Sequence, residues 1–249
     1  MIYVSSKLPE YPGMVRTLFF FLIFPWWTLL MLAASFIFSF RGPDAIFRCG
    51  QIYSRGCLRL AGVKVICRTC PEASPEGAVI YMPNHTGLFD IPALMTCIDH
   101  PFRWVAKKEL FRIPFFATAL RAAGTVCIDR RHREKAVASL NQAAERLRDG
   151  ESFTIFPEGT RSPDGRLLPF KKGGFMTAVH AQVPIIPVAI RGSAAVLSKH
   201  RMRIHPGVIE VQFLPALSTR GLTDKDRGHL MEKVRLNLVG ALASKKGAL

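Results

Sequence analysis

Residues 17–40 contain no charged side chain and are rich in Phe, Leu, Ile and Trp, and this stretch constrains the fold more than any other feature of the sequence. As a helix it is long enough to cross a hydrocarbon core of about 30 Å at about 1.5 Å per residue. It can also fold back as a hairpin within one leaflet, because Pro25 permits a kink and the adjacent tryptophans favour the interface. The apolar run is too long for a signal peptide, and a buried core helix is the soluble alternative. We therefore expect membrane attachment, by a spanning or a re-entrant segment.

Basic residues lie on both sides of this apolar stretch. Lys7 and Arg16 precede it, so the positive-inside rule gives only weak support for a cytosolic main body. After it, four arginines are interleaved with apolar residues: Arg41, Arg48, Arg55 and Arg59. This pattern predicts an amphipathic helix with a cationic side, which either lies in an anionic membrane interface or packs on the main domain.

The whole chain has a formal net charge of +16, so it requires a negatively charged partner or surface. Anionic lipid and nucleic acid are the two candidates. The six cysteines show no spacing typical of a disulfide framework, and we expect reduced thiols. Cys67 and Cys70 form a C-x2-C pair without a second pair or a suitable histidine nearby, so we expect no metal site.

From residue 63 onward, apolar runs typical of strands alternate with segments typical of helices. The expected strands cover residues 63–67, 77–82, 103–106, 124–129, 153–156, 185–190 and 208–213. The expected helices include one ending near residue 120, one over 136–147, one over 175–182, and a closing helix that Thr223 caps and that runs to about residue 242. This alternation predicts an α/β domain with a mixed, mostly parallel sheet flanked by helices. We place a membrane-associated helical segment at residues 1–60 and the main domain at 61–249.

The segment Asn84-His85-Thr86-Gly87-Leu88-Phe89-Asp90 follows the second expected strand, which Pro83 should end. On one regular helix His85 and Asp90 would lie roughly 140° apart and could not meet. They can meet if His85 lies in a turn, which Gly87 makes easy by permitting positive φ, and if Asp90 begins a helix. The carboxylate then fixes the tautomer of the imidazole and leaves its other nitrogen free to accept a proton. The pair is a candidate general base with its orienting partner; a turn-capping pair is the alternative.

A second polar loop, Phe156-Pro157-Glu158-Gly159-Thr160-Arg161-Ser162, follows the fifth expected strand. Arg161 offers a planar fork of donors, and Gly159 lets backbone N–H groups approach closely, so the loop suits a phosphate group. Taken alone, the loop has a surface turn with a salt bridge as its alternative. In α/β sheets, however, sites collect at the carboxyl ends of strands, where both polar segments lie.

Four segments occur in order within residues 60–215: residues 84–90, Gly124-Thr125-Val126-Cys127-Ile128-Asp129-Arg130, residues 156–162, and Val183-Pro184-Ile185-Ile186-Pro187-Val188-Ala189. Together they resemble the four motif blocks of the glycerolipid acyltransferases, most closely the 1-acylglycerol-3-phosphate acyltransferases. By this resemblance, His85 is the base that takes the proton from the acceptor hydroxyl, and Asp90 orients it. The hydroxyl itself is then the nucleophile, so we expect Cys127 to serve packing rather than covalent catalysis.

The resemblance also implies which residues bind the phosphate of the acceptor. They are Lys107, Arg130, Glu158, Gly159, Thr160 and Arg161, with Arg161 reaching the phosphate and Lys108 as the alternative to Lys107. The fourth block, with no polar group suited to chemistry, is expected to serve sheet packing and the wall of an acyl channel. Residues 170–175 are expected either to touch the donor or headgroup surface or to form a solvated turn.

The implied activity is transfer of a fatty acyl group from acyl-CoA or acyl carrier protein to the sn-2 hydroxyl of lysophosphatidate, with no metal or resident cofactor. The implied partners are the lyso-lipid, the acyl thioester and an anionic membrane surface, with no nucleic acid. The active domain is expected on the cytosolic face, at the inner membrane in a bacterium.

Another lysophospholipid or a lyso amino-acid lipid is an alternative acceptor. A non-catalytic protein that binds membranes or nucleic acid is the alternative from another class, and it gives no reason for four ordered blocks. A metal hydrolase lacks a third ligand at suitable spacing.

Overall fold

The seven expected strands form one sheet in the computed structural model, which describes residues 13–73, 76–197 and 203–244. The strands are β1 (Val63–Thr69), β2 (Ile80–Pro83), β3 (Phe102–Lys107), β4 (Val126–Ile128), β5 (Ser152–Thr154), β6 (Ile185–Arg191) and β7 (Gly207–Phe213). They lie side by side in the order β1-β7-β6-β2-β5-β3-β4. Neighbouring strands are parallel except β6 and β7, which are antiparallel. The predicted mixed, mostly parallel sheet is confirmed.

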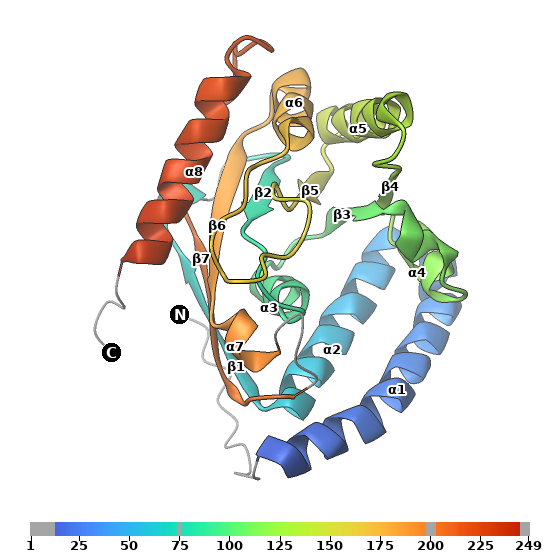
Figure 1. The fold of residues 1–249 in the computed structure, drawn as a ribbon. Coiled ribbons are helices and arrows are strands. Elements are labelled where there is room, and N and C mark those ends of the chain that lie inside the picture. Colours follow the sequence, from blue (N-terminus) through green and yellow to red (C-terminus); the bar gives the residue numbers. More distant parts are fainter. Residues whose placement is uncertain (1–12, 74–75, 198–202, 245–249) are drawn as a thin grey trace.

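Helices cover both faces of this sheet (Figure 1). One face packs against α1 (Gly13–Phe38), α2 (Pro43–Ala61), α3 (Asp90–Cys97) and α7 (Ser193–Val196). The other face packs against α5 (Arg133–Arg148), α6 (Lys172–Ala181) and α8 (Arg227–Ala243). Helix α4 (Phe116–Ala122) contacts α1 and α2, and the short 3-10 helices are η1 (Ser39–Arg41), η2 (Pro71–Ala73) and η3 (Lys108–Arg112).

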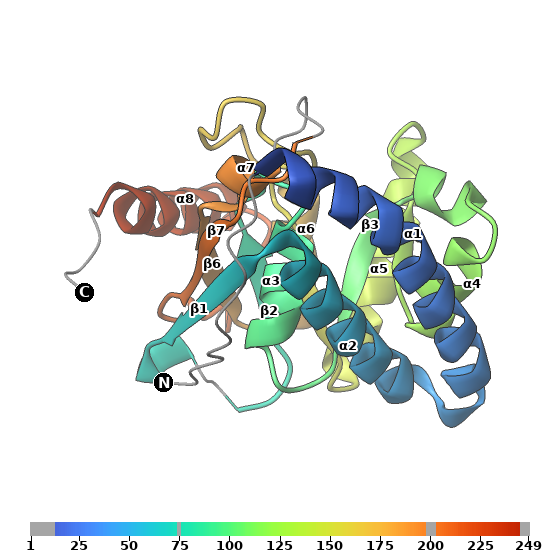
Figure 2. The ribbon, with the colours of Figure 1, turned by 90° about the horizontal axis from the view of Figure 1, so that it is seen from below.

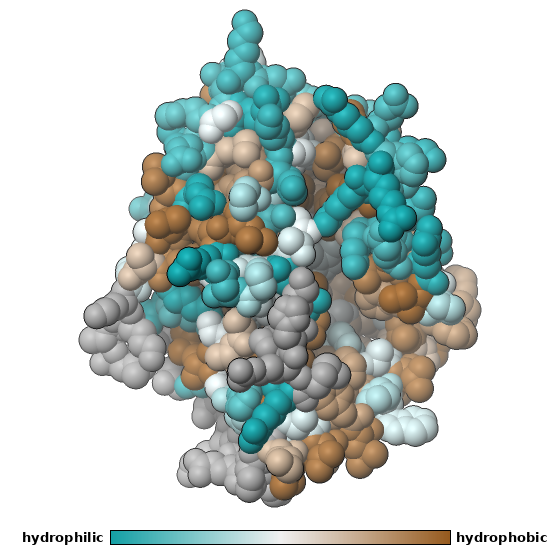
Figure 3. All heavy atoms as spheres, in the orientation of Figure 1, coloured by the Kyte–Doolittle hydropathy of each residue, from teal (hydrophilic) through white to brown (hydrophobic). Residues whose placement is uncertain are grey.

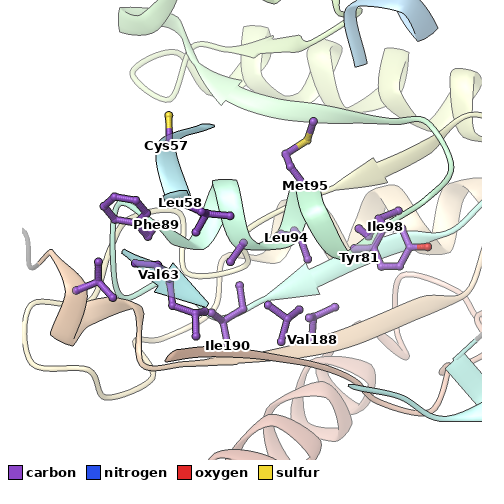
Figure 4. Close-up of a cluster of buried hydrophobic side chains, with 14 of the residues drawn as sticks. Cys57, Leu58, Val63, Tyr81, Phe89, Leu94, Met95, Ile98, Val188 and Ile190 are labelled. Carbon is purple, nitrogen blue, oxygen red and sulfur yellow. The ribbon is translucent and has the colours of Figure 1, made fainter. Parts of the chain in front are cut away.

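Alternate residues of the central strands enter two separate cores, because successive side chains of a strand point to opposite faces. Tyr81 of β2 belongs to the core shared with α2 and α3, whereas its neighbours Ile80 and Met82 belong to the core shared with α5 and α6. Figure 4 shows part of the first core, to which Leu94 of α3 and Ile190 of β6 contribute. Since helices cover both faces, the ends of the strands are the places left for a site.

Helix α1 is continuous through Pro25, so the alternative of a re-entrant hairpin within residues 17–40 is wrong. It runs alongside α2 (Figures 1 and 2), with Phe20 and Met31 buried. Its other side exposes large apolar residues: Met14, Val15, Leu18, Phe19, Leu22, Trp26, Leu29, Leu30, Phe36 and Ile37. By length and composition the segment Met14–Arg41 can cross a membrane. An exposed apolar face of this size is stable in lipid rather than in water, so it indicates membrane association.

Helix α2 is the amphipathic segment expected after residue 40, and it packs on the domain. Ile46, Phe47 and Leu58 are buried, and the arginines of the helix are exposed: Arg48, Arg55 and Arg59. A Cβ atom at Gly56 would lie 2.3 Å from the ring of Trp27, so glycine at this position lets α1 approach α2 closely. The alternative in which this helix packs on the main domain is therefore confirmed.

Two local expectations are wrong. Cys67 of β1 and Cys97 of α3 form a disulfide, where the sequence predicted reduced thiols. Their Cα atoms lie 5.6 Å apart because α3 packs beside β1, which a separation of 30 residues does not reveal. The closing helix begins at Arg227 rather than after Thr223, whose N–H and hydroxyl both donate to the carboxylate of Asp226.

Candidate active site

Polar segments that are distant in the sequence meet at one edge of the sheet, where the adjacent parallel strands β2, β5, β3 and β4 end. His85 follows β2, residues 156–162 follow β5, Lys107 ends β3, and Arg130 follows β4. The carboxyl ends of parallel strands are the usual position of ligand sites in α/β sheets. This edge is therefore the candidate active site.

His85 and Asp90 meet, as the turn geometry predicts. Nδ1 of His85 lies 2.7 Å from Oδ2 of Asp90, whose side chain is fully buried at the first position of α3. The same Oδ2 accepts hydrogen bonds from the backbone N–H groups of Thr86, at 2.7 Å, and of Gly87, at 2.9 Å. Because an ionised carboxylate only accepts hydrogen bonds, Nδ1 carries the proton and Nε2 presents a lone pair. Among the residues that the structure describes, none hydrogen-bonds to Nε2, so this nitrogen can accept a proton from a ligand.

The second carboxylate oxygen of Asp90 is held by Ser193, a residue that the sequence analysis did not select. Ser193 is fully buried at the start of α7, and its hydroxyl donates to Oδ1 of Asp90. The hydroxyl of Thr86 lies 3.0 Å from that of Ser193. A Cβ atom at Gly87 would lie 2.7 Å from the backbone and hydroxyl of Ser193, and Gly87 has no positive φ. Glycine is therefore required in this turn by close approach rather than by backbone conformation. The available signal was the position of Ser193 four residues after the fourth motif block, but its contact with Asp90 depends on β6 lying beside β2.

A stack of aromatic rings holds the imidazole of His85. The ring centroids of His85 and Phe156 are 4.0 Å apart and their planes differ by 23°. The ring of Trp104 continues the stack, 6.1 Å from Phe156 and nearly parallel to it. His85 and Phe156 follow the ends of β2 and β5, and Trp104 lies within β3, where it pairs with the last residue of β5. Sequence reasoning missed this role for Phe156 and Trp104, because it requires the order of the strands.

Glu158 joins the turn of His85 to the predicted phosphate loop from inside the protein. One carboxylate oxygen accepts the N–H of His85 at 2.7 Å, and the other accepts the N–H of Leu168 at 2.8 Å. The residue is 1% exposed, and burial raises the pKa of its carboxyl group. The N–H of Ser162 also donates to the carbonyl of His85, at 2.8 Å. Since both carboxylate oxygens are occupied, Glu158 is placed to hold the two loops together rather than to face a ligand.

The phosphate loop also carries a cationic side chain, that of Arg161, and a second arginine supports the loop. Arg130 donates a hydrogen bond to the carbonyl of Gly159, so the segment after β4 supports the loop after β5. Gly159 has φ of 72°, and the side chain of Thr160 is exposed. Arg161 is partly buried and forms no ion pair or hydrogen bond with any of the described residues. Its guanidinium group is thus available to an anion.

The two lysines after β3 differ in their contacts. Lys108 donates to Asp129 at 2.9 Å, and Nδ1 of His132 lies 3.0 Å from the same carboxylate. The hydrogen bond from Lys108 and, to a lesser degree, that from His132 hold the pKa of Asp129 well below its usual range. Lys107 is exposed and has no ion pair within the described part of the chain. Of these two lysines, Lys107 is therefore the one whose ammonium group is uncommitted.

Two other kinds of chemistry find little support at this edge. Burial raises the pKa of the Cys127 thiol, so the thiol is protonated at neutral pH, which favours a packing role over nucleophilic catalysis. Within residues 13–73, 76–197 and 203–244, no group of three or more His, Cys, Asp and Glu side chains could hold a metal ion.

Comparisons with known proteins point to one family. The family model described as Acyltransferase matches residues 65–191, which include His85, Asp90 and Arg161. The chain is 35% identical to a 1-acyl-sn-glycerol-3-phosphate acyltransferase of Escherichia coli over 182 residues, 73% of either chain. It is 34% identical to the alpha enzyme of that name from Mus musculus, over 72% of this chain and 64% of that one. The crystal structure of the 1-acyl-sn-glycerophosphate (LPA) acyltransferase PlsC from Thermotoga maritima superposes with a TM-score of 0.77 at 26% identity, covering 95% of this chain and 98% of that one. The chain therefore belongs to the 1-acyl-sn-glycerol-3-phosphate acyltransferase family.

Proposed function

We propose that this chain transfers a fatty acyl group from acyl-CoA or acyl carrier protein to the sn-2 hydroxyl of lysophosphatidate, giving phosphatidate. One observation carries the proposal: buried Asp90 holds Nδ1 of His85, which leaves Nε2 as a base beside a loop suited to phosphate. The relatives from Escherichia coli and Mus musculus are named for the same acceptor.

In the proposed reaction, Nε2 of His85 takes the proton of the sn-2 hydroxyl while the hydroxyl oxygen attacks the thioester carbonyl. A C–O bond forms and the carbonyl π electrons move to oxygen. The tetrahedral intermediate then collapses, the C–S bond breaks, and the thiolate takes the proton from the imidazolium. Asp90 stabilises the imidazolium between these steps. The N–H groups of Thr86 and Gly87 are bonded to Asp90, so other donors stabilise the oxyanion.

The acceptor phosphate in this proposal binds between three cations. Arg161 supplies the bidentate contact, because its planar guanidinium matches the geometry of phosphate oxygens and has no partner among the described residues. Arg130 contributes charge and keeps Gly159 in place. Lys107 adds a second exposed cation from the end of β3. Thr160, also exposed in this loop, offers a hydroxyl to the same group.

The exposed apolar face of α1 supports a reaction at the membrane surface. Both the lyso-lipid and its product partition into lipid, so an enzyme anchored through α1 takes its acceptor from the leaflet directly. The net charge of +16 favours a surface that contains anionic lipid. We place the active edge on the cytosolic face, where acyl thioesters are available.

The test is an acyl-transfer assay with the detergent-purified chain. Radiolabelled acyl-CoA and acyl carrier protein are offered separately, with lysophosphatidate and two other lysophospholipids as acceptors. Wild type forms phosphatidate, and His85→Ala lowers the rate by about 10²–10⁴-fold. The matched control is His180→Ala. His180 lies on α6, its Nε2 is 3.0 Å from the carboxylate of Asp224, and it serves no step of the reaction. Transfer only to another lyso-lipid would replace the acceptor, and no transfer to any acceptor would overturn the proposal.

A further inference from the structure

An open groove of about 510 Å³ lies along β4, the last strand of the sheet. Its walls come from η3, α4, β4 and α5, and its side chains include Lys108, Phe111, Arg112, Arg121, Thr125 and Arg146. Four of its lining residues are cationic and none is acidic. The groove therefore has the charge of an anion site, and none of the steps described above uses it.

The cations of this groove are of two kinds. Lys108 and Arg146 are anchored, by Asp129 at 2.9 Å and by Glu151 at 2.6 Å. Arg112 and Arg121 are exposed, and within the described ranges neither forms an ion pair. The exposed pair can therefore turn toward an anionic ligand without breaking an ion pair.

Two further groups lie in the groove wall. The guanidinium of Arg121 lies over the ring of Phe111, 6.0 Å from its centroid. The hydroxyl of Thr125, a residue that is 8% exposed, is buried with no hydrogen-bond partner among the described residues. An aromatic ring, flexible arginines and an unpaired hydroxyl are the groups that recognise a base and phosphates.

The groove is separate from the acceptor loop but continuous with the same edge. Strand β4 is three positions from β2, which at about 4.8 Å per strand places the groove about 14 Å from the strand that carries His85. Lys108 marks its near end, next to Lys107 and bonded to Asp129. A ligand held here can extend a flexible arm across β3 to His85. Its charged end then stays in the groove and does not occupy the acceptor phosphate site at Arg161.

We propose that this groove binds the nucleoside bisphosphate end of an acyl-CoA donor. The inference rests on the proposed acyl transfer, which requires a thioester donor whose carrier the acceptor loop does not hold. The volume lies within the range of about 300–1,000 Å³ typical of small-molecule sites. The phosphates pair with Arg112 and Arg121, and the base stacks near Phe111.

Two other anionic ligands match the groove less well. An acyl carrier protein would need a surface of roughly 800 Å² on each partner, far more than this groove offers. A lipid headgroup matches the position less well, because the α5 wall of the groove lies on the sheet face opposite α1, although the α4 wall contacts α1. Figure 3 shows hydrophobic residues over α1 at the lower right and hydrophilic residues over α5 at the upper right.

The test compares wild type with the double variant Arg112→Gln/Arg121→Gln, both full-length and in detergent. The matched control is Arg148→Gln, an exposed arginine of α5 that lines a different cavity. Calorimetry with adenosine 3′,5′-bisphosphate should show binding that is at least about tenfold weaker in the double variant and unchanged in the control. The KM for acyl-CoA should rise by a similar factor, while the KM for lysophosphatidate stays as in wild type.

Several results would overturn the inference. They are no bisphosphate binding by wild type, equal binding by wild type and the double variant, or an equal loss in Arg148→Gln. An equal rise in KM for acyl carrier protein would assign the groove to that protein. Weaker binding to phosphatidylglycerol vesicles with unchanged bisphosphate affinity would assign it to a lipid headgroup. Bisphosphate binding requires no turnover. A wild type that transfers no acyl group would therefore refute the proposed function, while calorimetry would still test whether the groove binds the bisphosphate.

Discussion

Replacing Ser193 by alanine tests whether the buried carboxylate must be held at both oxygens. Oδ2 of Asp90 would keep His85 and the N–H groups of Thr86 and Gly87. Oδ1 would lose the hydroxyl of Ser193 at a site that water does not reach, since Asp90 and Ser193 are both fully buried. The carboxylate would then have more freedom to rotate, and the imidazole would be held less firmly.

The expected size of the effect follows from the charge of the acceptor. A hydrogen bond to a charged group contributes about 1.5–3 kcal/mol, and each 1.4 kcal/mol is about tenfold in rate. We therefore expect Ser193→Ala to lower kcat by about 10- to 100-fold while the KM values for both substrates change little.

The assay is steady-state acyl transfer with each substrate varied, together with thermal unfolding of each variant. Ser152→Ala is the matched control: Ser152 is a buried serine of β5 whose hydroxyl accepts one backbone N–H, from Val79. It should lose stability without losing kcat. A folded Ser193→Ala enzyme with wild-type kcat would refute the reasoning, as would an equal loss of kcat in Ser152→Ala.

Three further predictions concern the loop that follows β5. Arg161→Gln should raise the KM for lysophosphatidate by about tenfold or more, while Arg166→Gln, on a side chain that is 89% exposed, should not; kinetics with varied acceptor checks this. Phe156→Leu should lower kcat by about 2- to 10-fold, because the ring stacked on His85 is lost; an unchanged kcat would contradict it. Burial raises the pKa of Glu158 above its value of 4.5 in the unfolded chain, so the folded state binds more protons between these values and stability falls as pH rises through this window. Urea unfolding from pH 4.5 upward should show this dependence in wild type and lose it in Glu158→Gln.

The elements of the fold were predictable because their signals are local. Apolar runs such as 185–190 are strands because every second side chain enters one core and the others enter the second. The contact between His85 and Asp90 was predictable for the same reason, since both residues lie in one turn and the start of one helix. The long uncharged segment indicated α1, although its periodicity did not reveal that the helix is unbroken at Pro25.

The contacts that complete the site were not predictable in this way. Ser193 and Asp90 are separated by 103 residues, and Glu158 and His85 by 73. Cys67 and Cys97 become partners only where α3 lies beside β1. None of these pairs leaves a periodic or spacing signal, because each depends on which segments become neighbours in the sheet.

By itself, then, the sequence determined the α/β class, an apolar N-terminal helix, the turn in which a histidine meets a carboxylate, and the family. The tertiary structure alone decided that β6 lies beside β2 and β5 between β2 and β3. That order brings Ser193 to Asp90, stacks Phe156 on His85 and turns Glu158 inward. The physical reason is the range of the interactions: helices, strands and turns depend on residues a few positions apart, whereas strand order depends on the burial of apolar surface over the whole chain.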